Sequence, residues 1–337
     1  MVATMHAVRA HERGGPEQFV YESAPRPEPA AGEVLVAVCA ASITAGELDW
    51  DATWTDRLDG TGHNRTPTVP SHEFSGIVAA LGSDVTDLEA GDEVFGLIPF
   101  TRDGAAAEYV TVPAHVLAAK PDTLDHDRAA AVPLAALTAW QALVAHAALQ
   151  PGQHVLIHGG AGGVGTFAVQ IARALGARVT ATASAHDRGL VNGLGAQRVI
   201  DYRGERFEDL VRDADVVLDL VGGETLRRSW ASVLRGGIVV SIVEPPDPDQ
   251  AAAHGARAAF FIVEPDRPGL VAIAELIDSG KLRPIVDRVV PFTETRAAYE
   301  ALVTEHPRGK VVLHVDHGAA EHESRPATTS SGTRRRL

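Results

Sequence analysis

A glycine-rich segment between an apolar strand and a helical stretch is the part of this sequence whose spacing points most directly to chemistry. Gly160-Ala-Gly162-Gly-Val-Gly165 has the G-x-G-x-x-G spacing and directly follows the strand pattern of residues 154–158. Glycines in this pattern allow a tight turn, bring the backbone close to a pyrophosphate and permit close packing of helix on strand. The motif alone also fits a surface turn, but the surrounding strands and helix are those of a dinucleotide site. We therefore predict that a dinucleotide contacts the backbone of this segment: Gly160, Ala161, Gly162, Gly163, Val164 and Gly165.

The end of the next strand bears on which dinucleotide is bound. Sites for NAD usually carry a carboxylate about 20 residues after the glycine motif, where it binds the ribose 2′-hydroxyl. Here the strand of residues 178–183 is followed by Ser184, with Arg188 shortly after it. A hydroxyl and a guanidinium suit a 2′-phosphate by hydrogen bonding and charge. Asp187 fits a helix-capping arrangement with Ser184 instead. We predict NADPH rather than NADH.

Composition excludes several other classes of protein. The 337 residues carry a formal net charge of −14, which disfavours nucleic-acid binding because phosphate backbones are repelled. Cys39 is the only cysteine, so an intrachain disulfide and a multi-cysteine metal site are excluded. No apolar run reaches the roughly 18 residues of a membrane span, and no secretory signal is visible. We expect a cytoplasmic protein without nucleic-acid or membrane partners.

The elements that must position these residues fall into three stretches. Up to about residue 126, short strands are separated by Gly and Pro, as in a small antiparallel barrel. From about residue 127 to 264, apolar strands alternate with helices, which indicates an α/β doubly wound parallel sheet. The last of its six strands is expected at 258–263. Residues 265–316 mix helices and strands and are expected to rejoin the first stretch, and the polar segment 317–337 is expected to be disordered.

Several segments resemble the medium-chain dehydrogenase/reductase superfamily, specifically its zinc-free quinone oxidoreductase branch, related to zeta-crystallin. They are Ala131–Ala142, the glycine segment, Leu194–Tyr202, Asp219–Gly223, Leu234–Gly237 and Arg308–Leu313. The resemblance covers roughly residues 5–315. It implies a GroES-like catalytic domain in 1–126 and 265–316 and a Rossmann NADP-binding domain in 127–264.

The resemblance also assigns residues to the cofactor. It places Tyr202 near the adenosine phosphate and Thr138 at the nicotinamide end, although a helix-internal threonine also bonds to its own helix. The strand of residues 260–263 is similar to one whose backbone meets the carboxamide. Further cofactor contacts follow from the matched segments: Val221, Phe261, Val263 and Lys310.

The resembled superfamily also contains zinc-dependent enzymes, so the residues at their zinc-ligand positions decide whether a metal is expected here. Pro70-Ser-His72-Glu73 resembles their Gly-His-Glu segment, so His72 is the candidate ligand. The matching first position falls in residues 42–49, which contain no cysteine, and the third falls near Leu134. Catalytic zinc needs about three protein ligands, and only Glu47 and Asp49 offer further donors nearby. We predict no metal, and His72 as a substrate-pocket residue instead.

The substrate side departs from the resembled pattern at one position. Relatives show asparagine where this sequence has Thr44, which we take as a donor to the substrate carbonyl together with Thr138. Trp50 and Trp54 follow closely, and their rings are expected to wall a flat apolar pocket.

These observations predict an NADPH-dependent oxidoreductase that delivers hydride to quinones or α,β-unsaturated carbonyls without zinc. One alternative is an enoyl-thioester reductase of the polyketide or fatty-acid type. Another is a non-catalytic NADPH-binding sensor or structural protein. The apolar terminal strand of the sheet and the family resemblance indicate a homodimer.

Overall fold

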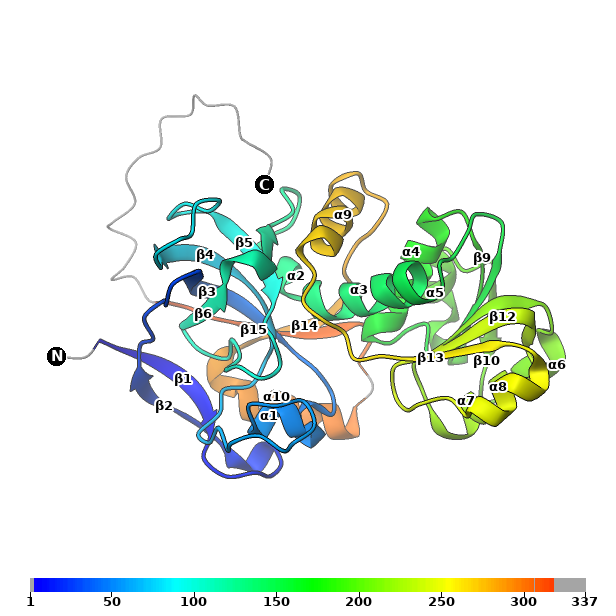
Figure 1. The fold of residues 1–337 in the computed structure, drawn as a ribbon, viewed down its shortest axis with the longest axis horizontal. Coiled ribbons are helices and arrows are strands. Elements are labelled where there is room, and N and C mark those ends of the chain that lie inside the picture. The colour runs from blue at the N-terminus through cyan, green and yellow to red at the C-terminus, as the bar shows by residue number, and fades with distance from the viewer. Residues whose placement is uncertain (1–2, 306, 318–337) are drawn as a thin grey trace. The chain divides into compact units, whose positions relative to one another are not determined.

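Two β-sheets and a hairpin organise the chain in the computed structural model, which describes residues 3–305 and 307–317 (Figure 1). The chain divides into two units. Among the described residues, unit 1 comprises 3–131, 288–305 and 311–317, and unit 2 comprises 132–287 and 307–310. The tail expected at 317–337 lies outside the described residues after His317.

Unit 1 is built on a seven-stranded sheet in which neighbouring strands run antiparallel wherever their register is defined. Its order is β14-β15-β3-β4-β5-β7, and β6 also pairs with β3. A separate hairpin is formed by β1 (Thr4–Ala10) and β2 (Phe19–Pro25). This confirms the antiparallel, GroES-like character expected of the first stretch. The other strands are β3 (Glu33–Ile43), β4 (Glu73–Leu81), β5 (Glu93–Leu97), β6 (Tyr109–Pro113), β7 (Leu117–Ala119), β14 (Val286–Pro291) and β15 (Lys310–His314).

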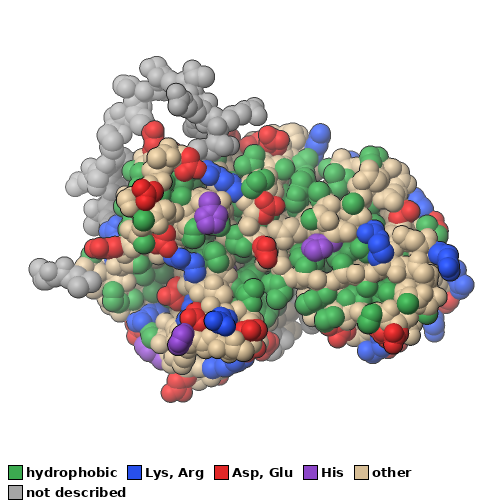
Figure 2. All heavy atoms as spheres, in the orientation of Figure 1, with side chains coloured by type: hydrophobic (Ala, Val, Ile, Leu, Met, Phe, Trp, Pro, Cys, Tyr) green, Lys and Arg blue, Asp and Glu red, His purple; other side chains and the backbone are tan. Residues whose placement is uncertain are grey.

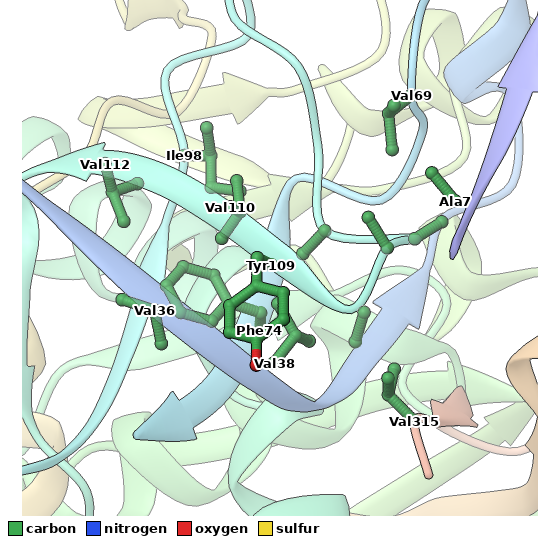
Figure 3. Close-up of a cluster of buried hydrophobic side chains, with 14 of the residues drawn as sticks. Ala7, Val36, Val38, Val69, Phe74, Ile98, Tyr109, Val110, Val112 and Val315 are labelled. Atoms are coloured by element: carbon green, nitrogen blue, oxygen red, sulfur yellow. The ribbon is translucent and has the colours of Figure 1, made fainter. Parts of the chain in front are cut away.

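The core of unit 1 lies on one face of this sheet. Alternate side chains of β3 and β6, such as Val36, Val38 and Val110, point to the same side and pack around Phe74 of β4 (Figure 3). This follows from the two-residue period of a strand, which places every second side chain on one face. Three short helices complete the unit: α1 (Asp51–Trp54), α2 (His126–Ala130) and α10 (Thr295–Thr304).

Unit 2 contains a six-stranded parallel sheet with the order β10-β9-β8-β11-β12-β13. The chain first moves outward from β8 to β10 and then returns to β11 beside β8. Because crossovers between parallel strands are right-handed, this reversal puts α4 and α5 on one face and α7 and α8 on the other, as Figure 1 shows. The strands are β8 (His154–Ile157), β9 (Arg178–Ala183), β10 (Arg198–Asp201), β11 (Ala214–Asp219), β12 (Val233–Ser241) and β13 (Arg257–Phe260).

The helices of unit 2 begin where the sequence supplies a start signal. Pro133 opens the third helix, because proline lacks only an N–H that would be unsatisfied there, and a π-helical turn over residues 141–146 follows it. The helices are α3 (Pro133–Trp140), α4 (Gly163–Ala174), α5 (Arg188–Leu194), α6 (Phe207–Leu210), α7 (Gly223–Ser229), α8 (Pro248–His254) and α9 (Arg267–Asp278). None of the helices in the described chain is long and apolar enough to cross a membrane.

The segment 265–287 differs from the expected division. We expected it in the catalytic domain, but it belongs to unit 2. The reason is packing. A Cβ placed on Gly269 of α9 would lie 3.0 Å from Leu137 Cδ2, and Gln170 Nε2 donates to the Arg283 carbonyl over 3.0 Å. The first boundary likewise falls after Ala131 rather than after residue 126.

Candidate functional site

The glycine segment forms the turn between β8 and α4. Gly159 has a φ of +75°, a left-handed conformation that favours glycine. A Cβ on Gly165 would overlap the Gly159 carbonyl oxygen, so the helix can approach the turn only without a side chain there. Since α4 begins at Gly163, its first N–H groups have no intrahelical partner and are available to a phosphate.

This turn lies where the strand order reverses. The carboxyl ends of β8 and β11 are adjacent there, and ligands of doubly wound sheets bind at such a point. Val221, which follows β11, is exposed, and a Cβ on Gly159 would lie 3.5 Å from its Cγ2 atom. Asp219 fixes the loop by accepting a hydrogen bond of 2.9 Å from the Gly222 N–H and one of 3.1 Å from Ser241 Oγ. Burial raises the pKa of the Asp219 carboxyl despite these donors. The structure thus brings Val221 to the glycine turn.

A segment from the far end of the chain crosses the same turn. The Gly309 N–H donates to the Ala161 carbonyl over 3.1 Å. The buried Lys310 side chain follows, and a Cβ on Gly163 would lie 3.1 Å from its Cδ atom. The structure therefore places Lys310 beside the glycine turn, as the resemblance implied.

The predicted 2′-phosphate residues lie after β9 in an arrangement that is already hydrogen bonded. Ser184 caps the following turn by accepting from the Asp187 N–H, which is the capping arrangement read from the sequence. Its hydroxyl donates to Asp187 Oδ2 over 2.6 Å. Arg308 was missed by sequence reasoning. Its Nε atom donates to Asp187 Oδ1 over 2.6 Å. Burial alone would raise the pKa of Asp187, but the bonds from Ser184 and Arg308 lower it.

Arg188 and Tyr202 lie in the same region. The Arg188 guanidinium is 3.2 Å from Glu205 Oε2, so its charge is partly neutralised. Tyr202 is 55% exposed, and its backbone N–H donates to the Ala183 carbonyl at the end of β9 over 3.3 Å. The Arg203 guanidinium lies over the Tyr202 ring, with its Cζ atom 5.5 Å from the ring centroid.

Phe261 and Val263 do not lie on the terminal strand where we expected them. β13 ends at Phe260, and both side chains are buried beyond it. The Phe261 ring stacks on His146 with 4.3 Å between centroids, and Gln141 holds the chain by accepting from the Glu264 N–H over 3.1 Å. The segment after β13 is therefore anchored to the π-helical turn, with the Phe261 and Val263 side chains buried and Ile262 exposed.

Thr138 is buried in α3, and its hydroxyl donates to the Leu134 carbonyl over 2.7 Å. A hydroxyl has one proton, so the donor role expected for Thr138 requires this bond to break. The structure shows instead the bond within the helix that sequence reasoning weighed as the other role.

In unit 1, His72 belongs to a buried network. His72 Nδ1 lies 2.7 Å from Glu47 Oε1, and its Nε2 lies 3.0 Å from the Arg102 carbonyl oxygen. Glu47 also accepts from the Ser71 N–H over 2.8 Å and from the Tyr299 hydroxyl over 2.5 Å. Burial opposes ionisation of Glu47, but these donors lower its pKa, while burial and the Glu47 charge raise the pKa of Tyr299. His72 is 2% exposed, so its side chain contacts this network rather than open space, and its substrate-pocket role stays a prediction.

The same contacts test whether a zinc ion fits. His72 Nδ1 faces Glu47 Oε1 and its Nε2 faces the Arg102 carbonyl oxygen, so a metal would have to displace one of these contacts in order to bind. Residues 3–305 and 307–317 contain no group of three His, Cys, Asp or Glu side chains arranged to hold a metal ion. Within that part of the chain, His72 therefore lacks the two further ligands that a catalytic zinc needs.

The remaining substrate-side residues surround this network. Thr44 is half-buried and begins the turn to Glu47, whose N–H donates to its carbonyl over 3.3 Å. The Trp50 ring packs edge-on against Phe100, which packs against His72. Trp54 is 3% exposed and donates to the Leu48 carbonyl over 2.9 Å, but it still borders a cavity of about 370 Å³. The cavity is otherwise lined by polar side chains: His11, Glu12, Arg13, Thr55, Asn64 and Thr66.

Comparison with known families identifies both parts of this arrangement. Residues 30–122 match the model described as the alcohol dehydrogenase GroES-like domain. Residues 194–313 match the model described as zinc-binding dehydrogenase.

Several relatives match over most of the chain. The mouse mitochondrial NAD(P)H oxidoreductase RTN4IP1 is 34% identical over 327 residues, covering 84% of this chain and 82% of the relative. The chloroplastic NADPH-dependent alkenal/one oxidoreductase of Arabidopsis thaliana is 37% identical over 261 residues, covering 74% and 64%. The quinone oxidoreductase structure from Coxiella burnetii superposes with a TM-score of 0.85 at 31% identity, covering 93% of this chain and 100% of that one. The chain belongs to the medium-chain dehydrogenase/reductase superfamily, in its quinone oxidoreductase-like branch.

Proposed function

We propose that this protein is an NADPH-dependent oxidoreductase that reduces quinones or α,β-unsaturated carbonyls. The observation that carries the proposal is the glycine turn at the reversal of strand order, lined by Val221 and crossed by Lys310. The names of the relatives support it, since they are an NAD(P)H oxidoreductase, an alkenal/one oxidoreductase and a quinone oxidoreductase.

The residues of unit 2 fit a nicotinamide dinucleotide. The N–H groups at the start of α4 would face its pyrophosphate, and Lys310 adds positive charge beside them. Three features support NADPH over NADH. Ser184 rather than a carboxylate follows β9, Arg188 and Arg308 lie close by, and Tyr202 offers an exposed ring. A 2′-phosphate would compete with Glu205 and Asp187 for the two guanidinium groups.

When bound, the nicotinamide supplies a hydride, and the chain must then position the acceptor and stabilise the charge that develops on its carbonyl oxygen. We assign the donor role first to Thr44, which lies at the turn before Glu47 in unit 1. Thr138 serves only if its hydroxyl leaves Leu134. The single proton that balances the hydride comes from water, because the buried tyrosine and histidine of unit 1 are hydrogen bonded to Glu47.

An acceptor of this kind is already electron-poor and needs no Lewis acid. The described residues place no group of three ligands around His72, which supports a reaction without a zinc ion that would turn an alcohol into an alkoxide. We therefore propose zinc-independent reduction and no appreciable oxidation of simple alcohols.

The test is a turnover panel with NADPH, monitored by loss of its absorbance. The panel contains a quinone, an alkenal and a crotonyl thioester, beside an alcohol with NADP. We expect turnover of the quinone or the alkenal. Activity on the thioester alone would establish an enoyl-thioester reductase, and tight NADPH binding without any turnover would establish a binding protein. Alcohol oxidation with no reaction on the electrophiles would overturn the proposal.

Two further properties complete the proposal. We place the protein in the cytoplasm on the strength of its single cysteine, although the mouse and Arabidopsis relatives are mitochondrial and chloroplastic. We also propose a homodimer, because β13 is the terminal strand of its sheet in the described chain and carries exposed residues such as Phe260. A stable monomer in sedimentation at micromolar concentration would refute the dimer.

A further inference from the structure

A line of hydrogen bonds runs through the interior of unit 2 from the glycine turn to α7. The Gly159 N–H donates to Thr182 Oγ1 over 3.2 Å, and the same oxygen lies 3.3 Å from His158 Nδ1. On the other side of the ring, His158 Nε2 lies 3.1 Å from Ser229 Oγ, which donates to the Thr225 carbonyl over 2.8 Å. The line joins β8, β9 and α7 at the carboxyl end of the sheet.

The direction of each hydrogen bond in the line follows from the Thr225 carbonyl at its α7 end. A carbonyl oxygen only accepts, so the Ser229 proton points to Thr225 and the Ser229 oxygen must accept from His158 Nε2–H. In a neutral ring Nδ1 then carries no proton and accepts from the Thr182 hydroxyl. The lone pairs of Thr182 remain for the Gly159 N–H. One arrangement, with His158 as the Nε2–H tautomer, therefore satisfies every group.

The surroundings keep His158 neutral. Its side chain is fully buried, and the edge of the Phe207 ring lies against it with 4.4 Å between centroids. Burial and the nearby Arg228 charge lower the pKa of His158 to about 3, against a smaller opposite effect of Glu208. A charged ring would donate from both nitrogens and leave the Thr182 proton without this acceptor.

We propose that Thr182 and His158 are positioning residues of the cofactor site, which fix the Gly159 peptide and with it the phosphate-facing turn. The Gly159 carbonyl, on the next peptide, accepts from the Gly162 N–H over 3.1 Å, so Gly159 is held through both of its peptides at the start of the loop that leads into α4. The inference rests on the proposed function in that it takes the glycine turn to be the cofactor site. Neither residue has to touch the cofactor.

The same pair of strands supplies a matched control. Thr180 lies on β9 two positions before Thr182, and both side chains are 4% exposed. Thr180 also binds a histidine of β8, with 2.8 Å between its Oγ1 and His154 Nε2. That pair lies at the amino end of β8, away from the turn, so Thr180→Val removes a comparable buried hydroxyl without reaching Gly159.

The experiment compares the affinities of Thr182→Val, Thr182→Ser and Thr180→Val for NADPH and NADH, by fluorescence titration without an electron acceptor. Thr182→Val should weaken binding of both cofactors at least fivefold, since it leaves the Gly159 N–H without its acceptor. Thr182→Ser keeps the hydroxyl and should stay within twofold of the wild type, as should Thr180→Val. A value for Thr182→Val within twofold of the wild type, or equal losses in the two valine variants, would overturn the proposal.

A second measurement needs only wild-type protein and one reference variant. In protein labelled with ¹⁵N-histidine, the His158 signals, assigned by their absence in His158→Gln, should show a protonated Nε2 and a bare Nδ1 from pH 8 down to pH 5. The opposite tautomer, or a charged ring in that range, would refute the arrangement even if Thr182→Val did not fold. If the wild-type protein binds cofactor but reduces neither quinone nor alkenal, the proposed function is wrong. The titrations and the histidine spectra would still test the role of Thr182 and His158 in that case.

Discussion

Arg308 Nε lies 2.6 Å from Asp187 Oδ1, although the two residues are 121 positions apart in the chain. The contact brings a cation from the C-terminal segment to the turn that follows β9, within unit 2. Because Asp187 is also bonded to Ser184, one carboxylate holds two of the three residues that we expect at a 2′-phosphate. Figure 2 shows acidic and basic side chains interspersed over the face that it draws.

Replacing Arg308 should therefore change which cofactor is preferred. Arg308→Ala is expected to weaken NADPH about 10- to 100-fold and to leave NADH nearly unchanged, since a charge-assisted hydrogen bond contributes about 1.5–3 kcal/mol. Arg188→Ala should also weaken NADPH binding, but by a smaller factor, because Glu205 already neutralises part of the Arg188 charge. Arg178→Ala is the control, as Arg178 pairs with Asp213 at the other end of β9. Equal losses for NADPH and NADH, measured by fluorescence titration, would contradict a 2′-phosphate site.

Two threonines separate the possible donors to the substrate carbonyl. Thr44→Val is expected to lower kcat about 100-fold or more, since loss of one such donor typically costs about 2.7–4 kcal/mol in the barrier. Thr138→Val should lower it about threefold or less, because the Thr138 proton is donated to Leu134. Steady-state kinetics with NADPH and a quinone provide the comparison, and the reverse order of effects would show that Thr138 is the donor.

The buried network in unit 1 should contribute strongly to stability. Glu47→Ala leaves His72 and Tyr299 without their shared acceptor and is expected to lower the free energy of unfolding by about 3–5 kcal/mol. Tyr299→Phe should cost about 1–3 kcal/mol. Glu300→Ala, on the same helix as Tyr299, removes only an exposed pair with Arg296 and should cost about 0.5 kcal/mol or less. Urea denaturation measures all three, and a Glu47 effect as small as that of Glu300 would contradict the role of the network.

His158 should make stability depend on pH. Its pKa is lowered from 6.5 to about 3 in the folded chain, so between these values the unfolded chain binds one proton more than the folded chain. Stability therefore rises with pH through this window and is lost as pH falls, by up to about 1.4 kcal/mol per pH unit. Unfolding measured from pH 7 to pH 4.5 should show a steeper slope for the wild type than for His158→Gln. Parallel slopes would mean that His158 titrates in the folded state.

Purified protein should contain zinc well below one equivalent, as His72 is held by Glu47 and by the Arg102 carbonyl. Elemental analysis and an activity assay with a chelator test this directly. One zinc per chain, or chelator-sensitive activity that zinc restores, would show that the His72 contacts rearrange around a metal.

The glycine segment and the parallel sheet could be predicted from sequence because their signals are local. Each glycine has a fixed place between a strand and a helix, and the apolar strands of unit 2 are continuous. The cap formed by Ser184 and Asp187 was also readable, since both partners lie within one turn. The network around His72 was not predicted, because Glu47 and the Arg102 carbonyl, which contact His72, and Tyr299, which contacts Glu47, come from segments that periodicity does not connect.

Arg308 escaped prediction for a similar reason. Its segment was recognised as a family match, but its contact with Asp187 depends on the chain returning across the glycine turn at Gly309. The segment 265–287 was placed in the wrong domain because an amphipathic helix such as α9 does not reveal which partner buries its apolar face. Long-range pairing rather than local propensity decided each of these outcomes.

Because β15 pairs with β3, with Val311 opposite Ile43, this part of the sheet of unit 1 can form only late in synthesis. Ser42 and Val311 are 269 positions apart, so at about 5–20 residues per second the ribosome needs on the order of 15–50 s to deliver the partner strand. Throughout that time residues 40–43 of β3 lack their native neighbour, although residues 33–37 on the same edge already have β6, and an open strand edge is a site of aggregation. A nascent chain arrested after residue 287 would carry this edge permanently. Expression at a lower temperature, or together with additional chaperones, should therefore raise the yield of folded protein more than substitutions on its surface.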